Sequence, residues 1–171
     1  MIEPLAKRMG AVTPSNRLFL VFYIGDERYA LPATDVVEVL PRLPLKPIAQ
    51  APVWVAGVFA HRAQMVPVID VSAMTFGYAA VARTSTRLVL VDFRGKLLGL
   101  MLEQASDTLR CNPDDFQPYG LDNRDAPYLG PVRKDAHGLI QWIRVDDLLS
   151  PAVCALLFPA NPDDAFTREL A

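Results

Sequence analysis

The stretch G-V-F-A-H-R-A-Q-M-V-P-V-I-D-V, residues 57–71, decides how this chain folds. It covers most of two short apolar runs, residues 53–59 and 65–71, which are separated by a mixed patch at residues 60–64. Short runs rich in Val and Ile predict two antiparallel strands joined by a tight turn. Pro67 has no backbone N–H, so we expect the second strand to lie at a sheet edge or to carry a bulge there. An edge strand would also offer a partner a place to dock.

The second half of the chain, from about Thr86, repeats the first half. A shift of 69 positions places residues 18–31 on residues 87–100, each a strand, a short turn and a strand, with Arg94 and Gly95 as the second turn. The same shift aligns Glu38 with Asp107 and Leu40 with Leu109. A second shift, of 74 positions, covers the later hairpin: it aligns Val58 with Val132, residues 65–69 with residues 139–143, and Met74 with Leu148. Because the matches keep their order, they predict two similar half-barrels.

Short strands at this spacing favour small antiparallel barrels over a parallel α/β sheet, because no amphipathic helix of about 10 to 15 residues separates them. One helical turn is expected at residues 72–77. Ser150 and Pro151 predict the start of a terminal helix over residues 151–158, with Val153, Leu156 and Leu157 packed on a barrel. Residues 1–16 and 159–171 lack apolar periodicity, and we expect a flexible N-terminal tail and a polar C-terminal tail.

Composition limits the classes of function that the chain can have. The 171 residues are 51% hydrophobic and 21% charged, which suits one compact domain, or two very small domains that share a core. The net charge of −2 and the scattered basic residues make nucleic acid an unexpected partner. Cys111 and Cys154 are far apart and are expected to be reduced. Neither a signal peptide nor an apolar run long enough for direct membrane insertion is evident, so we expect a soluble cytoplasmic protein.

Residues that carry chemistry are sparse. His61 and His137 have no second ligand at metal spacing, and we expect both to be solvent-exposed turn residues. The chain has no G-x-S-x-G, P-loop or dinucleotide-binding motif, and its paired aspartates fall where capping and solvation explain them. We therefore expect a protein that is not an enzyme and needs no cofactor or metal, and whose functional part is a contact surface.

The central stretch resembles the hairpin of the CheW-like adaptor domains of bacterial chemotaxis, whose pattern is roughly G-V-x-N-L-R-G-x-x-V-P-V-x-D-L. The residues that match it are Gly57, Val58, Arg62, Val66, Pro67, Val68 and Asp70, whereas Ala60, His61 and Ala63 differ. The family's Arg-Gly pair suits a turn with positive φ at its second residue, where Ala63 costs about 1 kcal/mol more than Gly. We therefore expect a slightly altered hairpin tip.

The resemblance extends over residues 17–158. It includes F-x-I-G-x-x-x-Y-A-L-P at residues 22–32, V-x-E-V-L at 36–40, L-G-L-x-x at 98–102 and G-L-I-Q-W-I at 138–143. Arg144 stands where an Asp is common, which weakens any helix-capping role there. The resemblance implies a mostly β fold of two small five-stranded SH3-like β-barrels, intertwined and packed together, with a short C-terminal helix.

The resemblance also implies a function. CheW-like proteins are non-catalytic adaptors between the signalling tip of a methyl-accepting chemoreceptor and the regulatory domain of a CheA-type histidine kinase. Receptor helices would rest in an apolar groove near the barrel junction, while another face would pair with a kinase barrel. The altered tip suggests a divergent adaptor, for example in a Wsp-type surface-sensing pathway that controls cyclic-di-GMP, or in twitching motility.

The expected contact patch combines residues from three strands: Val36, Glu38, Gly57, Val58, Arg62 and Val66. Glu38 either faces solvent on an alternating strand or belongs to the interface. Arg62 is either an ordinary exposed turn arginine or a residue that reaches Glu38 or a partner carboxylate. Gly99, Pro67 and Asp70 are expected to be structural, Gly99 by allowing close backbone approach in the second barrel. The alternative is a small β-barrel that binds a ligand or nucleic acid, but the clustered basic and aromatic residues that would favour it are absent.

Overall fold

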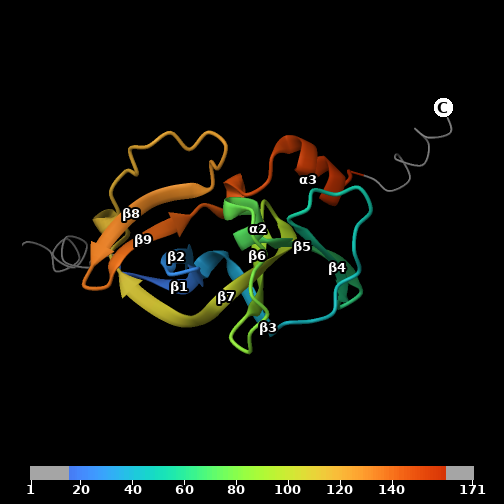
Figure 1. Ribbon diagram of the computed structural model, residues 1–171, viewed down its shortest axis with the longest axis horizontal. Coiled ribbons are helices and arrows are strands. Elements are labelled where there is room, and N and C mark those ends of the chain that lie inside the picture. The colour runs from blue at the N-terminus through green and yellow to red at the C-terminus, as the bar shows by residue number, and fades with distance from the viewer. Residues whose placement is uncertain (1–15, 161–171) are drawn as a thin grey trace, which may run out of the picture.

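The computed structural model describes residues 16–160, which form mostly β-strands (Figure 1). The expected tails lie outside the described residues, apart from Asn16, Pro159 and Ala160. In chain order the elements are β1 Arg17–Ile24, β2 Glu27–Pro32, η1 Ala33–Asp35, β3 Val36–Pro41, β4 Val55–His61, β5 Gln64–Asp70, α2 Val71–Phe76, β6 Arg87–Phe93, β7 Lys96–Cys111, η2 Pro113–Asp115, β8 Leu129–Asp135, β9 Gly138–Ile143, η3 Val145–Asp147 and α3 Pro151–Leu157. The expected class, mostly β with a short C-terminal helix, is confirmed.

The strands form two barrels that share β7. The first barrel contains β3, β4, β5, β6 and residues 96–102 of β7, and the second contains β1, β2, β8, β9 and residues 103–111 of β7. Isolated bridges extend the outer strands, from Lys46 to Val58 of β4 and from Gln117 to Val132 of β8. The curved β7 therefore runs through both barrels (Figure 1).

The sequence repeat is confirmed at the level of single residue pairs. Phe22 pairs with Tyr29 in β1–β2, as Val91 pairs with Leu98 in β6–β7 at a shift of 69. The two halves exchange strands, because β2 pairs in parallel with β9 and β5 pairs in parallel with β7. Each half of the chain therefore supplies strands to both barrels.

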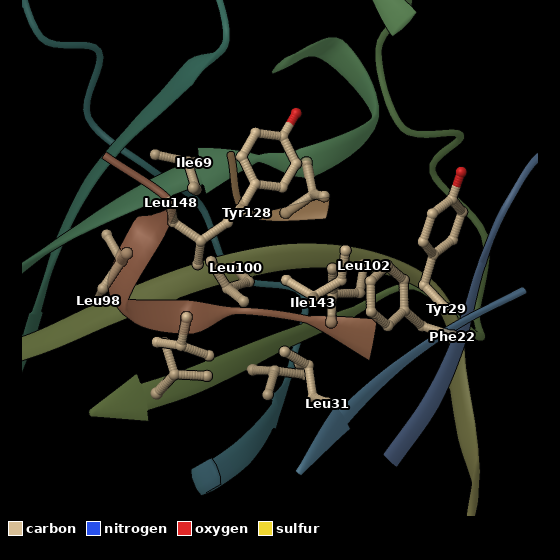
Figure 2. Close-up of a cluster of buried hydrophobic side chains, with 14 of the residues drawn as sticks. Phe22, Tyr29, Leu31, Ile69, Leu98, Leu100, Leu102, Tyr128, Ile143 and Leu148 are labelled. Carbon is tan, nitrogen blue, oxygen red and sulfur yellow. The ribbon is translucent and has the colours of Figure 1, made fainter. Parts of the chain in front are cut away.

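A large apolar core lies between the barrels and receives side chains from both. Figure 2 shows Leu31 of β2, Ile69 of β5, Leu100 of β7 and Ile143 of β9 meeting there, and all four are fully buried. A smaller cluster fills each barrel, around Val66 in the first and around Phe19 in the second. Three apolar clusters, one between the barrels and one inside each barrel, therefore hold the fold together.

Strands β1 and β6 face two cores at once. Alternate residues of β1 point into the second barrel and into the shared core, as Val21 and Phe22 illustrate. Leu90 and Val91 divide in the same way between the first barrel and the shared core. Because both faces are buried, these strands need continuous apolar runs rather than alternation with polar residues.

The hairpin of β4 and β5 confirms the two strands and the tight turn expected from residues 57–71. Arg62 and Ala63 form the turn with φ angles of 49° and 64°, the left-handed pair of a type I′ turn. Arg94 and Gly95 form the same turn between β6 and β7, with φ angles of 49° and 81°. The expected alteration of the tip is therefore wrong, and Ala63 keeps the geometry that Gly would adopt more easily.

The expectation drawn from Pro67 is also wrong. β5 lies between β4 and β7, and the register shift in the hairpin falls between Val55 and Gly57 rather than at Pro67. Val58, opposite Pro67, exchanges both backbone hydrogen bonds with Lys46. The nitrogen of Pro67 therefore faces β7, where pairing begins only at the next residue. A proline is tolerated inside this sheet because no ladder bond is required of it.

Both expected helices are present, and each has a side-chain cap. Asp70 caps α2, and its side chain accepts a hydrogen bond from the Ala73 N–H at 3.1 Å. Ser150 caps α3 in the same way, through the Val153 N–H at 3.3 Å. Leu156 is exposed rather than packed on a barrel, so that part of the expectation is wrong. The helix instead packs through a stripe formed by Val153, Cys154, Leu157 and Phe158.

The left-handed conformation of Ala63 yields a stability prediction. We expect Ala63→Gly to raise the free energy of unfolding by about 1 kcal/mol, because Gly adopts positive φ without the steric cost of a Cβ. Chemical denaturation measures the change. Ala60→Gly is the matched control, since Ala60 lies in β4 without positive φ and Gly there should lower stability by about 0.5 to 1 kcal/mol. A loss of stability in both variants would contradict the turn assignment.

Candidate functional site

Three polar side chains meet where the tip of the β4–β5 hairpin approaches β3. The Nε2 atom of His61 lies 3.0 Å from Oε2 of Glu38, and Nη2 of Arg62 lies 3.6 Å from Oε1 of the same carboxylate. The expected contact of Arg62 with Glu38 is therefore present. The expectation that His61 is a solvent-exposed turn residue is wrong, because its side chain is only 17% exposed. His137, in contrast, is exposed.

Not every residue of the expected patch lies at the surface. Val36 and Val58 are half-buried, whereas Gly57 is buried and Val66 is fully buried in the first barrel. A Cβ on Gly57 would lie 2.6 Å from the Lys46 carbonyl oxygen, so this position requires glycine for close backbone approach. Gly57 and Val66 therefore lie beneath the patch and do not form its outer face.

Two valines on β3 that sequence reasoning missed are exposed. Val37 is 56% exposed and Val39 is 44% exposed, while the residues between and beside them are half-buried. The alternation V-V-E-V-L carried this signal, since it places Val37 and Val39 on the opposite face of the strand from Glu38. Exposed β-branched residues on an outer strand are available to a partner.

Two buried carboxylates hold the connection between the halves of the chain. Asp70 accepts a second hydrogen bond from the Ala80 N–H at 2.9 Å, and Glu103 accepts one from the Val81 N–H. The Thr86 hydroxyl donates to the Val81 carbonyl oxygen at 2.6 Å. Glu103 was missed, although a single carboxylate inside an apolar strand was a signal for it.

Gly99 lies where β7 pairs with β5. A Cβ there would be 2.8 Å from Cγ2 of Val68, so a larger residue would force β5 away. This close approach belongs to the first barrel, so the expectation that placed it in the second barrel is wrong.

Arg144 precedes η3 and forms no side-chain cap, in agreement with its departure from the family pattern.

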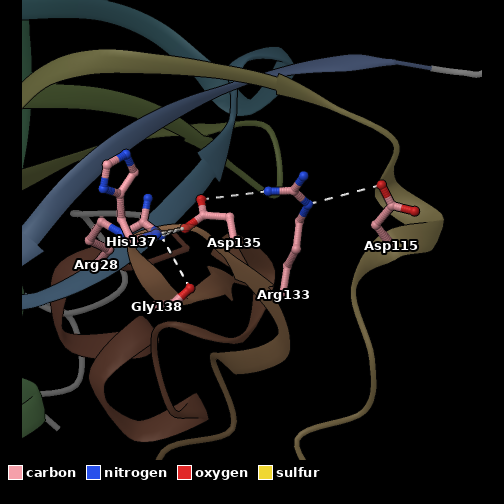
Figure 3. A network of polar contacts seen from close by, with 6 residues as sticks. All are labelled: Arg28, Asp115, Arg133, Asp135, His137 and Gly138. Atoms are coloured by element: carbon pink, nitrogen blue, oxygen red, sulfur yellow. Dashed lines mark hydrogen bonds and ion pairs between the residues drawn. The ribbon is translucent and has the colours of Figure 1, made fainter.

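The site in the second barrel that corresponds to the Glu38, His61 and Arg62 cluster has a different set of polar contacts. The repeat places Asp135 where the first barrel has His61, and Figure 3 shows Arg28 and Arg133 on either side of its carboxylate. Arg28 donates to Asp135 and to the Gly138 carbonyl oxygen, and the His137 N–H donates to Asp135 at 2.8 Å. Burial alone would raise the pKa of the Asp135 carboxyl, but these hydrogen bonds outweigh it and hold the pKa below its usual value.

A hollow of about 450 Å³ lies at the junction of the barrels. Its lining is mixed: the apolar side chains are Trp54, Met74, Pro127, Tyr128, Leu148, Leu149 and Pro151, and the polar ones are Arg94, Arg124, Asp125, Asp147 and Ser150. Within residues 16–160 no group of three or more His, Cys, Asp and Glu residues is placed to hold a metal ion. Over the same residues, none of the helices has the length and apolar character needed to cross a membrane.

Comparison with known proteins gives a consistent result. Residues 18–152 match the family described as CheW-like domain. The chain is 27% identical to the chemotaxis protein CheW of Helicobacter pylori, over 77% of this chain and 80% of that protein. It is 38% identical to protein FrzA of Myxococcus xanthus, over 74% and 81%. The crystal structure of the scaffolding protein TtCheW from Thermoanaerobacter tengcongensis superposes with a TM-score of 0.74, at 20% identity, over 82% and 92%.

The Asp135 network predicts a pH-dependent contribution to stability. Because the folded pKa is depressed, the contribution is complete above the unfolded value of about 3.9 and is lost as the pH falls through the folded value. We expect Asp135→Asn to lower the free energy of unfolding by about 1 to 3 kcal/mol at pH 7, with the difference from wild type shrinking below about pH 4. Denaturant titrations at a series of pH values measure this difference in the free energy of unfolding.

Asp107→Asn is the matched control, because Asp107 is exposed and its replacement should change the free energy of unfolding by less than about 0.5 kcal/mol. A difference that persists unchanged at acid pH would contradict this account.

Proposed function

The chain belongs to the CheW-like domain family, and from this we propose that it is a non-catalytic adaptor that couples a methyl-accepting chemoreceptor to a CheA-type histidine kinase. The observation that carries the proposal is the family match over residues 18–152, which spans both barrels. The scaffold named TtCheW, which shares the fold, supports a role in assembly. The adaptor would act at the cytoplasmic signalling tip of the receptor.

The junction between the barrels suits the receptor. Its hollow combines apolar side chains, such as those of Trp54 and Tyr128, with the charged side chains of two arginines and two aspartates. An amphipathic helix of the receptor tip would lay its apolar face against the apolar side chains of this hollow and meet the charged ones at its polar flanks. The receptor would therefore touch both barrels at once.

The outer surface of the first barrel suits the kinase regulatory domain. Val36, Glu38, Val58 and Arg62 bring charge and apolar area together, and Gly57 and Val66 support them from below. Transient interfaces between signalling proteins are often small and weak individually, and repeated contacts in an array add avidity. Two distinct contact faces are what a bridging protein needs.

The proposal also concerns the signalling pathway in which the adaptor acts. The hairpin tip has Ala60, His61 and Ala63 where the family pattern has Asn, Leu and Gly, which supports a divergent adaptor rather than the principal flagellar one. A Wsp-type surface-sensing pathway with cyclic-di-GMP output fits such a divergent member. Deletion of the gene, followed by measurement of cyclic-di-GMP on surfaces and of swimming in liquid, separates these pathways.

Binding measurements test the adaptor function directly. We expect the full chain to bind both a chemoreceptor signalling domain and a CheA-type regulatory domain from the source organism, as isothermal titration calorimetry would measure. Arg62→Ala should weaken binding to the kinase domain by about fivefold, because a charged contact at the interface is lost. Arg110→Ala is the control, since this exposed arginine lies on the second barrel. Binding of wild type to neither domain would refute the proposal.

A further inference from the structure

We propose that His61 is a positioning residue of the first-barrel patch: it holds Glu38 through Nε2, so that the Arg62 guanidinium keeps only a long contact with Glu38 and can bind a carboxylate of the partner. The inference rests on the proposed adaptor function, and it assigns separate roles to three residues that lie together. Glu38 and His61 form the internal pair, and Arg62 forms the external contact.

The two contacts of Glu38 are unequal. The 3.0 Å separation of Nε2 and Oε2 is a hydrogen bond, whereas the 3.6 Å separation of Nη2 and Oε1 is beyond hydrogen-bond distance. A carboxylate only accepts, so the His61 proton in this bond must sit on Nε2. His61 contacts the Oε2 atom of Glu38 and Arg62 contacts the Oε1 atom, and the contact with His61 is the shorter of the two.

Burial divides the three side chains in the same way. The side chains of His61 and Glu38 are 17% and 31% exposed, whereas that of Arg62 is 78% exposed. The His61 ring also lies 5.9 Å from the ring of Phe59, which is buried in the first barrel. Packing and hydrogen bonding therefore fix His61, while Arg62 extends from the turn with one weak contact.

The second barrel lacks this arrangement. At the equivalent positions, Asp135 replaces His61 and Asp107 replaces Glu38, so two acids stand where the first barrel has a hydrogen-bonded pair. Asp135 is held by Arg28 instead, and Asp107 is exposed. The residue that corresponds to Arg62 is Ala136, which presents no charge. The cationic contact is thus a property of the first barrel's tip.

Removal of the His61 donor has a definite consequence. Glu38 would keep Arg62 as its remaining partner, and the guanidinium would turn inward to pair with it. Arg62 would then be less available to a partner although it is unchanged in sequence. His61→Leu makes this change while keeping an apolar side chain against Phe59, and His61→Gln keeps an N–H donor.

Calorimetry with the CheA-type regulatory domain as the probe tests the inference. We expect His61→Leu to weaken binding by about fivefold and His61→Gln to remain within about twofold of wild type. Arg62→Ala should cost about fivefold in the wild-type background and less than about twofold in the His61→Leu background, because Arg62 is already sequestered there. Equal costs in the two backgrounds would overturn the inference. If His61→Leu does not fold, His61→Ala replaces it.

A measurement without any partner separates this inference from the adaptor function. In ¹⁵N-labelled full-length protein, we expect a proton on Nε2 of His61 and slower motion of the Arg62 Nε–H group in His61→Leu than in wild type. Asp107→Asn should leave both signals unchanged. Unchanged Arg62 motion in His61→Leu would overturn the role of His61, even if the kinase domain binds. Failure of wild type to bind the kinase domain, with the expected change in Arg62 motion, would overturn the partner contact alone.

Discussion

The apolar core shared between the two barrels is the constraint on which the rest of the structure depends. Because the two halves of the chain exchange strands, β2 pairs with β9 and β5 pairs with β7, so neither half can complete a barrel by itself. β1 and β6 consequently have no solvent face along most of their length, and both must be apolar at successive positions. A polar residue at Val21 or at Phe22 would enter one core or the other.

This constraint explains where the chain can vary. Gly57 and Gly99 sit where backbones approach closely, and Val66 fills the first barrel, so these positions are restricted by packing. At the hairpin tip, where β3 approaches His61, the chain carries Ala60, His61 and Ala63 without any change in the type of turn. Recognition can thus diverge at the tip while the barrels stay the same, because the turn depends on two left-handed residues and not on the family's own side chains.

The sequence predicted most of the local structure, since that information lies in neighbouring residues. The apolar runs, the Arg94–Gly95 turn and the Ser150 cap all depend on short-range signals, and the repeat supplied the register of both halves. The failures involve contacts between distant segments. Pro67 is tolerated because its nitrogen faces β7, where pairing begins only at Val68, and His61 is shielded because β3 closes against the hairpin tip. No pattern in residues 57–71 encodes either partner.

The carboxylates show how the same chemical group serves structure in one place and recognition in another. Asp70 and Glu103 are buried and accept backbone N–H donors, so they fix the connection at residues 77–86 and join the two halves of the chain. Glu38 lies partly at the surface and has two side-chain partners, His61, which is largely buried, and Arg62, which is exposed. Backbone donors cannot be exchanged without unfolding the connection, whereas an arginine can leave one carboxylate for another at little cost. An exchange of partners by Arg62 therefore requires no break in the backbone hydrogen bonds of the barrels.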